Sequence, residues 1–180
     1  MRVRLSRKAS GSSIAEIPVA LFVLLIVLLF PLLDLGTIAL RSATIFEAAR
    51  NAAHHAGRAK SFLQDGGEGE LSAKSAAVKW TALTCHSSLR GTSIESSDVQ
   101  ATIIGTPFDT KKTPVRSASP LPGVEPETYL YQIEVSVTGS VEPLVLLNKD
   151  LLGQIPGVTA PLKISATFRE FCEHPYGLTI

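Results

Sequence analysis

The chain has 180 residues, a length typical of one domain plus a segment that attaches it to something else. Its 17 lysines and arginines nearly balance its 16 aspartates and glutamates, so no global basic field attracts nucleic acid and no charged tail favours disorder. The charges are unevenly placed, however. Four basic residues and no acidic one fall within the first eight positions, and the next basic residue is Arg41.

An apolar segment follows the basic cluster. From Ile17 to Leu33, 17 consecutive residues carry neither a charge nor a polar side chain, and the apolar residues on either side lengthen the segment. The whole exceeds the ~20 residues that cross a hydrocarbon core. Glu16 and Asp34 lie near its ends, where headgroup water makes a carboxylate less costly than at the bilayer centre. Because cytoplasmic flanks are rich in Lys and Arg, we expect a cytoplasmic N-terminus and an exported C-terminal part.

Two other interpretations apply to such a segment. A cleaved secretory signal has an apolar region of ~7–15 residues that ends in a small-x-small site. The sequence Leu33-Asp34-Leu35-Gly36 has no small residue at the earlier of those two positions. A helix buried in a soluble core is also disfavoured, because hydrophobicity on every side suits lipid better than a domain of this size.

A short motif stands directly before the span. The basic leader ends in Gly11, and Glu16 follows five positions later at the mouth of the apolar helix. A carboxylate inside an apolar segment costs up to ~2.5–3.5 kcal/mol, which a neighbouring chain's α-amine could offset through a charge-assisted hydrogen bond. Alternatively, Gly11 is a loop glycine and Glu16 marks the boundary of an ordinary membrane anchor.

This motif resembles the processing site of type IV pilins and pseudopilins. The resemblance implies that a membrane-embedded prepilin peptidase cuts after Gly11, that Ser12 becomes the new N-terminus, and that Glu16 docks the subunit to its partners. The alanine-rich sequence from Leu40 to Ala59 resembles the extension of TadE-like proteins, which are minor pseudopilins of the tight-adherence (Tad) pilus and secretion system. That family implies a bacterial inner-membrane protein whose partners are membrane lipid, the peptidase and other pilus subunits.

The residues after the span predict an exported helical stalk. Residues 38–63 lack proline and are rich in alanine, the best helix former. Pro31 removes a backbone hydrogen bond within the helix, so we expect a bend there. Heptads counted from Ile38 give two seams of mostly small side chains, Ile38, Ile45, Ala52 and Ala59 in one and Ser42, Ala49, Ala56 and Leu63 in the other. These seams fit either the chain's own domain or another subunit.

The remaining sequence predicts a small α+β domain of pilin-like outline, with one or two helices and about three antiparallel strands. A glycine-rich stretch at 64–69 ends the stalk, and a second helix is expected from Glu70 to Leu89 with Gly91 as its stop. The chain therefore divides into a basic cytoplasmic leader at 1–11, a membrane helix and stalk at 12–63, and an extracytoplasmic domain at 64–180.

Three strands are expected from β-branched or alternating residues, at Val99–Ile104, Tyr129–Val137 and Leu162–Phe168. The proline-rich residues 105–128 between the first two read as an exposed loop. Pro143–Leu152 fits either a short amphipathic helix or a hydrophobic crossover.

No pattern of catalytic or metal-ligating residues accompanies this architecture. His54 and His55 are adjacent and would point to different faces of a helix, while His86 and His174 stand alone, so no metal-ligand spacing is present. Nucleophile-elbow and phosphate-loop motifs are also missing from the sequence. We therefore expect no enzyme activity, no metal or other cofactor, no small-molecule substrate and no nucleic-acid partner.

Cys85 and Cys172 are the only cysteines, and both follow the span. An even pair in an oxidising compartment is most simply a disulfide. A bond closing this loop would contribute about 4–5 kcal/mol in the chain-entropy model. Two unpaired thiols are the alternative.

These observations together predict a TadE-like minor pseudopilin or pilus-assembly factor without enzymatic activity. The alternative is a membrane-anchored extracytoplasmic binding domain unrelated to pili. The two hypotheses differ at the processing site, because only the first requires the chain to be cut between Gly11 and Ser12.

Overall fold

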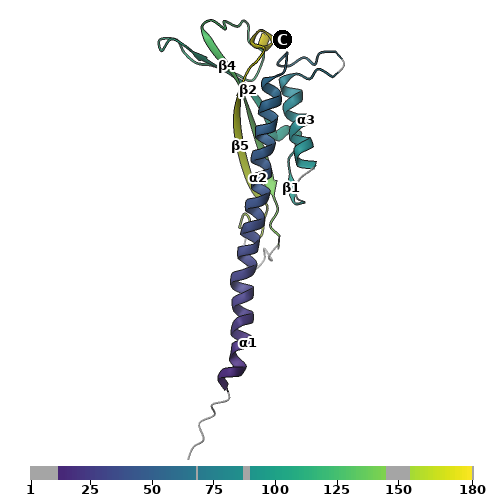
Figure 1. Ribbon diagram of the computed structural model, residues 1–180, viewed down its shortest axis with the longest axis vertical. Coiled ribbons are helices and arrows are strands. Elements are labelled where there is room, and N and C mark those ends of the chain that lie inside the picture. The colour runs from purple at the N-terminus through teal and green to yellow at the C-terminus, as the bar shows by residue number, and fades with distance from the viewer. Residues whose placement is uncertain (1–11, 68, 87–89, 145–154, 180) are drawn as a thin grey trace, which may run out of the picture.

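One long helix carries a small α+β domain at its C-terminal end (Figure 1). The computed structural model describes residues 12–67, 69–86, 90–144 and 155–179. Within these ranges the predicted α+β class is confirmed. The long helix comprises three consecutive segments, α1 (Ser12–Leu24), a π-helical turn (Leu25–Leu29) and α2 (Phe30–Gly57).

The long helix continues through both of its prolines. Pro18 lies inside α1, and Pro31 is the second residue of α2. Proline lacks the N–H that an α-helix needs, and its ring crowds the carbonyl four residues earlier. A π-helical turn at Leu25–Leu29 directly precedes α2, and a local change to i→i+5 hydrogen bonding is one way a helix adjusts to such a residue. We expected a bend at Pro31; the structure shows a π-helical turn just before this residue, within an uninterrupted helix.

Five antiparallel strands form one sheet beside α2. They are β1 (Thr92–Ser93), β2 (Val99–Pro107), β3 (Val115–Ser117), β4 (Tyr129–Val141) and β5 (Leu162–Phe171). The long strand β4 is central. Along one edge it pairs with β2 at residues 129–137 and with β1 at Ser140 and Val141, and along the other edge it pairs with β5 at residues 132–141. β3 pairs with the far side of β2.

The three predicted strands are therefore present, and β1 and β3 are two short strands that the sequence did not predict. β3 lies inside residues 105–128, which we expected to be an exposed loop. Most of the segment Pro143–Leu152 lies outside the described residues.

The second predicted helix is α3 (Ala73–His86), shorter than expected. It begins after Ser72, whose Oγ accepts the backbone N–H of Ser75 at 3.3 Å as an N-cap. The Asp65 carboxylate in turn accepts the backbone N–H of Ser72 at 2.8 Å. Because Asn51 of α2 lies beside Thr84 of α3, and Ser61 beside Ala73, the two helices run antiparallel.

Helix α2 ends at Gly57 rather than at the predicted Leu63. A Cβ at Gly57 would lie 2.7 Å from the carbonyl oxygen of Phe171, so this glycine marks the closest approach of α2 to the end of β5. The chain then leaves the helical path, because Phe62 is fully buried in the core and its N–H donates to the Gly177 carbonyl at 3.1 Å.

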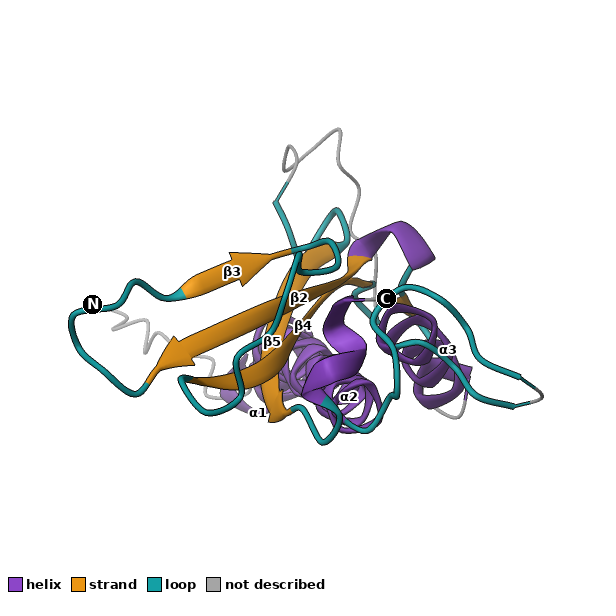
Figure 2. Ribbon diagram, turned by 90° about the horizontal axis from the view of Figure 1, so that it is seen from above, coloured by secondary structure: helices purple, strands orange, loops and turns teal. Residues whose placement is uncertain are grey.

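The hydrophobic core lies between α2, α3 and one face of the sheet (Figure 2). Most of the predicted helix seams face this core, since Ile45, Ala49, Ala52 and Ala56 are fully buried. Small side chains let α2 approach the sheet closely: a Cβ at Gly139 of β4 would lie 2.6 Å from Cδ1 of Ile45. This part of the helix therefore packs on the chain's own domain. Leu63, placed in the same seams, is exposed.

The opposite face of the sheet is polar. In β4 the residues Ile133, Val135 and Val137 are buried towards the helices, while Ser136 and Thr138 point away from them. Figure 2 shows the helices gathered on one side of the sheet.

Candidate functional site

The first part of the long helix is a candidate membrane span. The helical stretch Ile17–Gly57 contains an 18-residue window with mean hydropathy 2.7, none of which is buried in the domain. Every large apolar side chain from Ile17 to Leu33 is exposed to the surroundings. A contiguous apolar surface of this size marks a site of contact with lipid or with another protein. The helix is therefore long enough and apolar enough to cross a membrane.

The residues of the predicted processing site lie at the start of this helix. Gly11 is outside the described residues, whereas Ser12 begins α1 and Glu16 follows within its second turn. The side chains of Ser12 and Glu16 also lie outside what the structure describes. The apolar exposed surface begins immediately after them, at Ile17.

Where the apolar surface ends, three residues on one face of α2 hold the helix to the base of the domain. The Asp34 Oδ1 accepts the backbone N–H of Leu144 at 2.5 Å. Arg41 donates from Nη1 to the backbone carbonyl of Glu142. Ile38 lies between them and is buried. Positions 34, 38 and 41 follow one another up the same face of the helix, and we call these contacts the helix–domain junction.

Gly91 fits against the Arg41 guanidinium in this junction. Its φ of +93° is a conformation that glycine adopts without strain. A Cβ at Gly91 would lie 2.6 Å from Cζ of Arg41, so any larger residue would also displace the guanidinium. The Gly91 carbonyl accepts the N–H of Glu142 at 2.8 Å, which joins the start of β1 to the end of β4.

The sequence interpretation missed the helix–domain junction. From the sequence, Asp34 was placed only near the end of the span, and Arg41 was noted only as the first basic residue after the leader. One pattern in the sequence could have indicated this junction. Asp34 and Arg41 are seven residues apart, as are Ile38 and Ile45, and this spacing places all four residues on a common face of the helix. That the backbone of Glu142 and Leu144 meets this face depends on the tertiary fold.

A second cluster lies on the polar face of the sheet. Glu134 of β4 is only 5% exposed and forms ion pairs with Arg116 of β3 and with Arg169 of β5, the latter at 2.7 Å. Hydroxyl pairs at 3.2 Å, Thr138 with Ser165 among them, continue along β4 and β5. A buried carboxylate needs such partners. The cluster is explained as a structural network that joins three strands.

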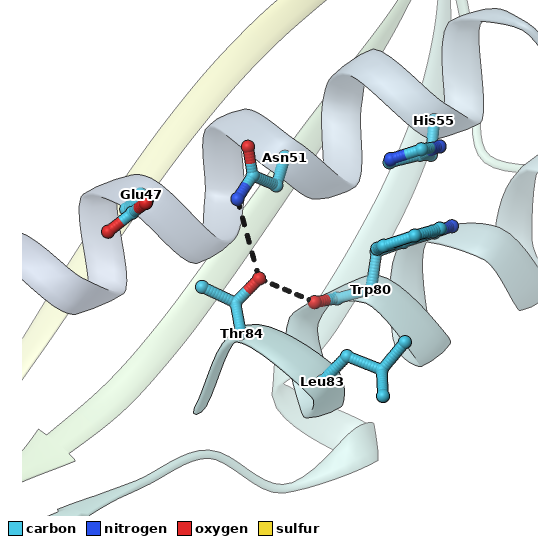
Figure 3. A pocket seen from close by; sticks show the side chains of 6 residues that line it. All are labelled: Glu47, Asn51, His55, Trp80, Leu83 and Thr84. Carbon is cyan, nitrogen blue, oxygen red and sulfur yellow. Dashed lines mark hydrogen bonds between the residues drawn. The ribbon is translucent and has the colours of Figure 1, made fainter. Parts of the chain in front are cut away.

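A shallow hollow opens between α2 and α3 (Figure 3). The His55 ring stacks on Trp80, with 3.6 Å between ring centroids and 4° between planes. Asn51 donates a hydrogen bond to the Thr84 hydroxyl at 3.5 Å. Burial lowers the pKa of His55, with help from the charges of His54 and Arg58, so its ring is neutral at pH 7. Within the described residues, no group of three or more His, Cys, Asp or Glu could hold a metal ion.

The predicted disulfide is absent, because both cysteines are free thiols in the structure. The two cysteines lie at different heights along α2. Cys85 is next to Thr84, which contacts Asn51 of α2. Cys172 is next to Glu173, whose N–H donates to the carbonyl of Gly57 at the end of α2. These levels on α2 differ by six residues, or about 9 Å of helical rise. A disulfide requires Cα atoms within about 7 Å. Burial raises the pKa of both thiols, so they remain protonated at neutral pH.

Comparison of the chain with protein-family models, curated proteins and solved structures finds no match.

Proposed function

We propose that the chain is a TadE-like minor pseudopilin or pilus-assembly factor, a non-enzymatic protein of the bacterial inner membrane. The observation that carries the proposal is the division of one continuous helix. Its first part exposes large apolar side chains all round, and its second part is buried against a sheet. Such a subunit offers an apolar helix to lipid and to partner helices while holding it rigidly to a folded domain.

The sequence before the helix supports the same function. Basic residues precede Gly11 without an acidic partner, which favours retention of the leader in the cytoplasm. Gly11 would then present the scissile bond to the prepilin peptidase at the inner face of the membrane. Cleavage would leave Ser12 as the N-terminus and Glu16 as a carboxylate close to the start of the apolar surface.

The Glu16 carboxylate would dock the helix to other pilus subunits. At the edge of the apolar span an unpaired carboxylate costs less than at the bilayer centre but would still gain from a charged partner. The α-amine of a neighbouring processed chain would supply a charge-assisted hydrogen bond that water replaces poorly. This pairing would favour assembly of processed chains over isolated ones.

Intact mass of the protein from its native membrane tests the processing step directly. We expect the mass of a chain that begins at Ser12. Gly11→Leu should leave a full-length protein that still inserts, because leucine fills the space beside the scissile bond while the basic flank and span are unchanged. Gly67→Leu is a matched control, since a Cβ at Gly67 meets nothing within 4 Å and cutting should continue.

Glu16→Ala separates docking from processing. We expect this variant to be cut and inserted, yet to co-purify with fewer pilus subunits and to reduce piliation. Glu127→Ala removes an exposed glutamate from the exported domain and should have no effect. If the native protein keeps Met1–Gly11 and both Gly11→Leu and Glu16→Ala leave piliation unchanged, the better description is an anchored binding domain unrelated to pili.

A further inference from the structure

The part of the long helix that is apolar and exposed on every side ends at Leu33, and contacts with the folded domain begin at Asp34. The 20 residues from Ile17 to Gly36 span about 30 Å at 1.5 Å per residue, which matches the thickness of a hydrocarbon core. Asp34 lies within the last turn of this stretch and already bonds Leu144 of the domain. Ile38, one turn further, is already buried. No length of free stalk therefore separates the span from the domain.

The base of the domain exposes apolar side chains at this same level. Leu144, whose backbone bonds Asp34, is 54% exposed, and Ile155 is 43% exposed. Ile155 is held in place by a compact turn: its N–H donates to the Thr159 hydroxyl at 2.7 Å, and its carbonyl accepts the Thr159 N–H at 2.9 Å. The same turn carries Gly157, where an added Cβ would lie 3.4 Å from Cδ1 of Ile38 in the helix. The backbones of both residues are therefore held beside the end of the span.

The helix contributes further apolar surface around these residues. Leu35 is 64% exposed and Leu40 is 63% exposed, so the exposed apolar surface continues from the span past the base of the domain. The Asp34 carboxylate and the Leu144 N–H satisfy one another. Such mutual pairing matters most where water is scarce, since an unpaired backbone group or carboxylate is costly in lipid.

We infer that the base of the domain rests in the outer headgroup layer of the bilayer, with Leu144 and Ile155 in contact with lipid. This is a second membrane contact, beyond the spanning helix, and it holds the domain against the bilayer surface. Continuity with the apolar surface of the span identifies lipid as the occupant. The inference requires the helix to span a membrane, but it is independent of cleavage at Gly11 and of any role in pili.

Tryptophan quenching by lipid tests this contact in the full chain. The protein has one tryptophan, Trp80, which lies on α3 in the exported domain and gives the baseline. Leu144→Trp and Ile155→Trp each add a tryptophan at an exposed site. In phosphatidylcholine vesicles whose acyl chains are brominated near the headgroup, we expect loss of most of the added emission for both variants.

Two further variants make the outcome decisive. Phe108 lies beside Thr128, at the opposite end of β4 from the base of the domain. The 13 residues of β4 extend about 40 Å at ~3.3 Å per residue. The added emission of Phe108→Trp should therefore be unchanged by brominated lipid. Leu25→Trp lies midway along the span, so it should be quenched by phosphatidylcholine brominated near the ends of its acyl chains. Quenching of Leu25→Trp without quenching of Leu144→Trp or Ile155→Trp would overturn the inference while leaving the span intact.

Absence of quenching even for Leu25→Trp would overturn the span and the inference together. A second copy of the chain could instead cover the apolar base. In that case the emission of Leu144→Trp and Ile155→Trp would resist brominated lipid and shift with protein concentration, which would also overturn the lipid contact.

Discussion

The two parts of the long helix share a secondary structure but are adapted to different surroundings. Between Ile17 and Leu33 the side chains are large, aliphatic or aromatic and exposed on every side. Between Ile45 and Gly57 the buried face is mostly alanine and packs directly on the sheet. Large side chains suit contact with fluid lipid tails, whereas small ones let the helix backbone approach a fixed neighbour. Side-chain size, more than helix propensity, therefore separates the two parts.

A charge placed in the buried part should produce the largest effect on folding. Ala52 is fully buried against the sheet, so Ala52→Asp buries a carboxylate without a partner. We expect the domain to lose about 3–5 kcal/mol of stability, as when a buried ion pair is broken. Thermal unfolding in detergent measures the loss. Ala43→Asp, on an exposed position of the same helix, should remain close to wild type; equal destabilisation by both variants would contradict the comparison.

A charge placed in the exposed part should affect insertion and spare the fold. Leu25 lies midway along the apolar surface and is exposed, so Leu25→Asp carries a carboxylate to the bilayer centre. The free energy of membrane insertion should become less favourable by about 2.5–3.5 kcal/mol. The fraction of protein resistant to carbonate extraction should fall while the domain's melting temperature stays the same. A fall in melting temperature as large as that of Ala52→Asp would show that both parts are buried in the protein.

The helix–domain junction sharpens the boundary between the two parts. Asp34→Ala removes the acceptor of the Leu144 N–H and should cost about 1 kcal/mol, the net contribution of a typical hydrogen bond, because Leu144 is partly exposed. Asp34→Asn keeps an oxygen acceptor and should cost less. Hydrogen exchange at the Leu144 amide should be faster in Asp34→Ala than in Asp34→Asn. Equal exchange in both variants and wild type would show that this hydrogen bond does not hold the domain to the helix.

Local patterns in the sequence predicted the long apolar helix and the three longer strands, because burial on one face of β4 requires alternating residues such as Ile133 and Val135. Short elements leave no such pattern: β3 has only three residues and exists because Val115 meets Gly105 of β2. The predicted disulfide failed for a related reason. Counting cysteines reveals a pair, but the distance between Cys85 and Cys172 is set by how α3 and β5 pack on α2.

The same reasoning explains the misplaced end of α2. Alanine-rich sequence favours a helix through residue 63, yet the close contact of Gly57 with β5 and the burial of Phe62 direct the chain elsewhere. Tertiary packing overrides propensity at this point. The helix–domain junction was missed in the same way, since its helix face was readable but its backbone partners were not.

The smallest expected effect concerns His55, on the part of the helix that faces α3. Burial lowers the pKa of His55 from its usual value near 6.5, and the neighbouring His54 and Arg58 lower it further. The unfolded chain therefore binds more protons than the folded one as pH falls through and below 6.5, so this contribution to stability is complete above that pH and is lost on acidification. We expect the melting temperature of the wild type to fall more between pH 7.5 and pH 5 than that of His55→Gln, with His54→Gln as the control for loss of a neighbouring imidazole. Because the ring is partly exposed, the difference should be small. A larger acid-induced fall in melting temperature for His55→Gln than for the wild type would contradict the predicted direction. It would also contradict the view that the neutral form of His55 stabilises the contact between α2 and α3.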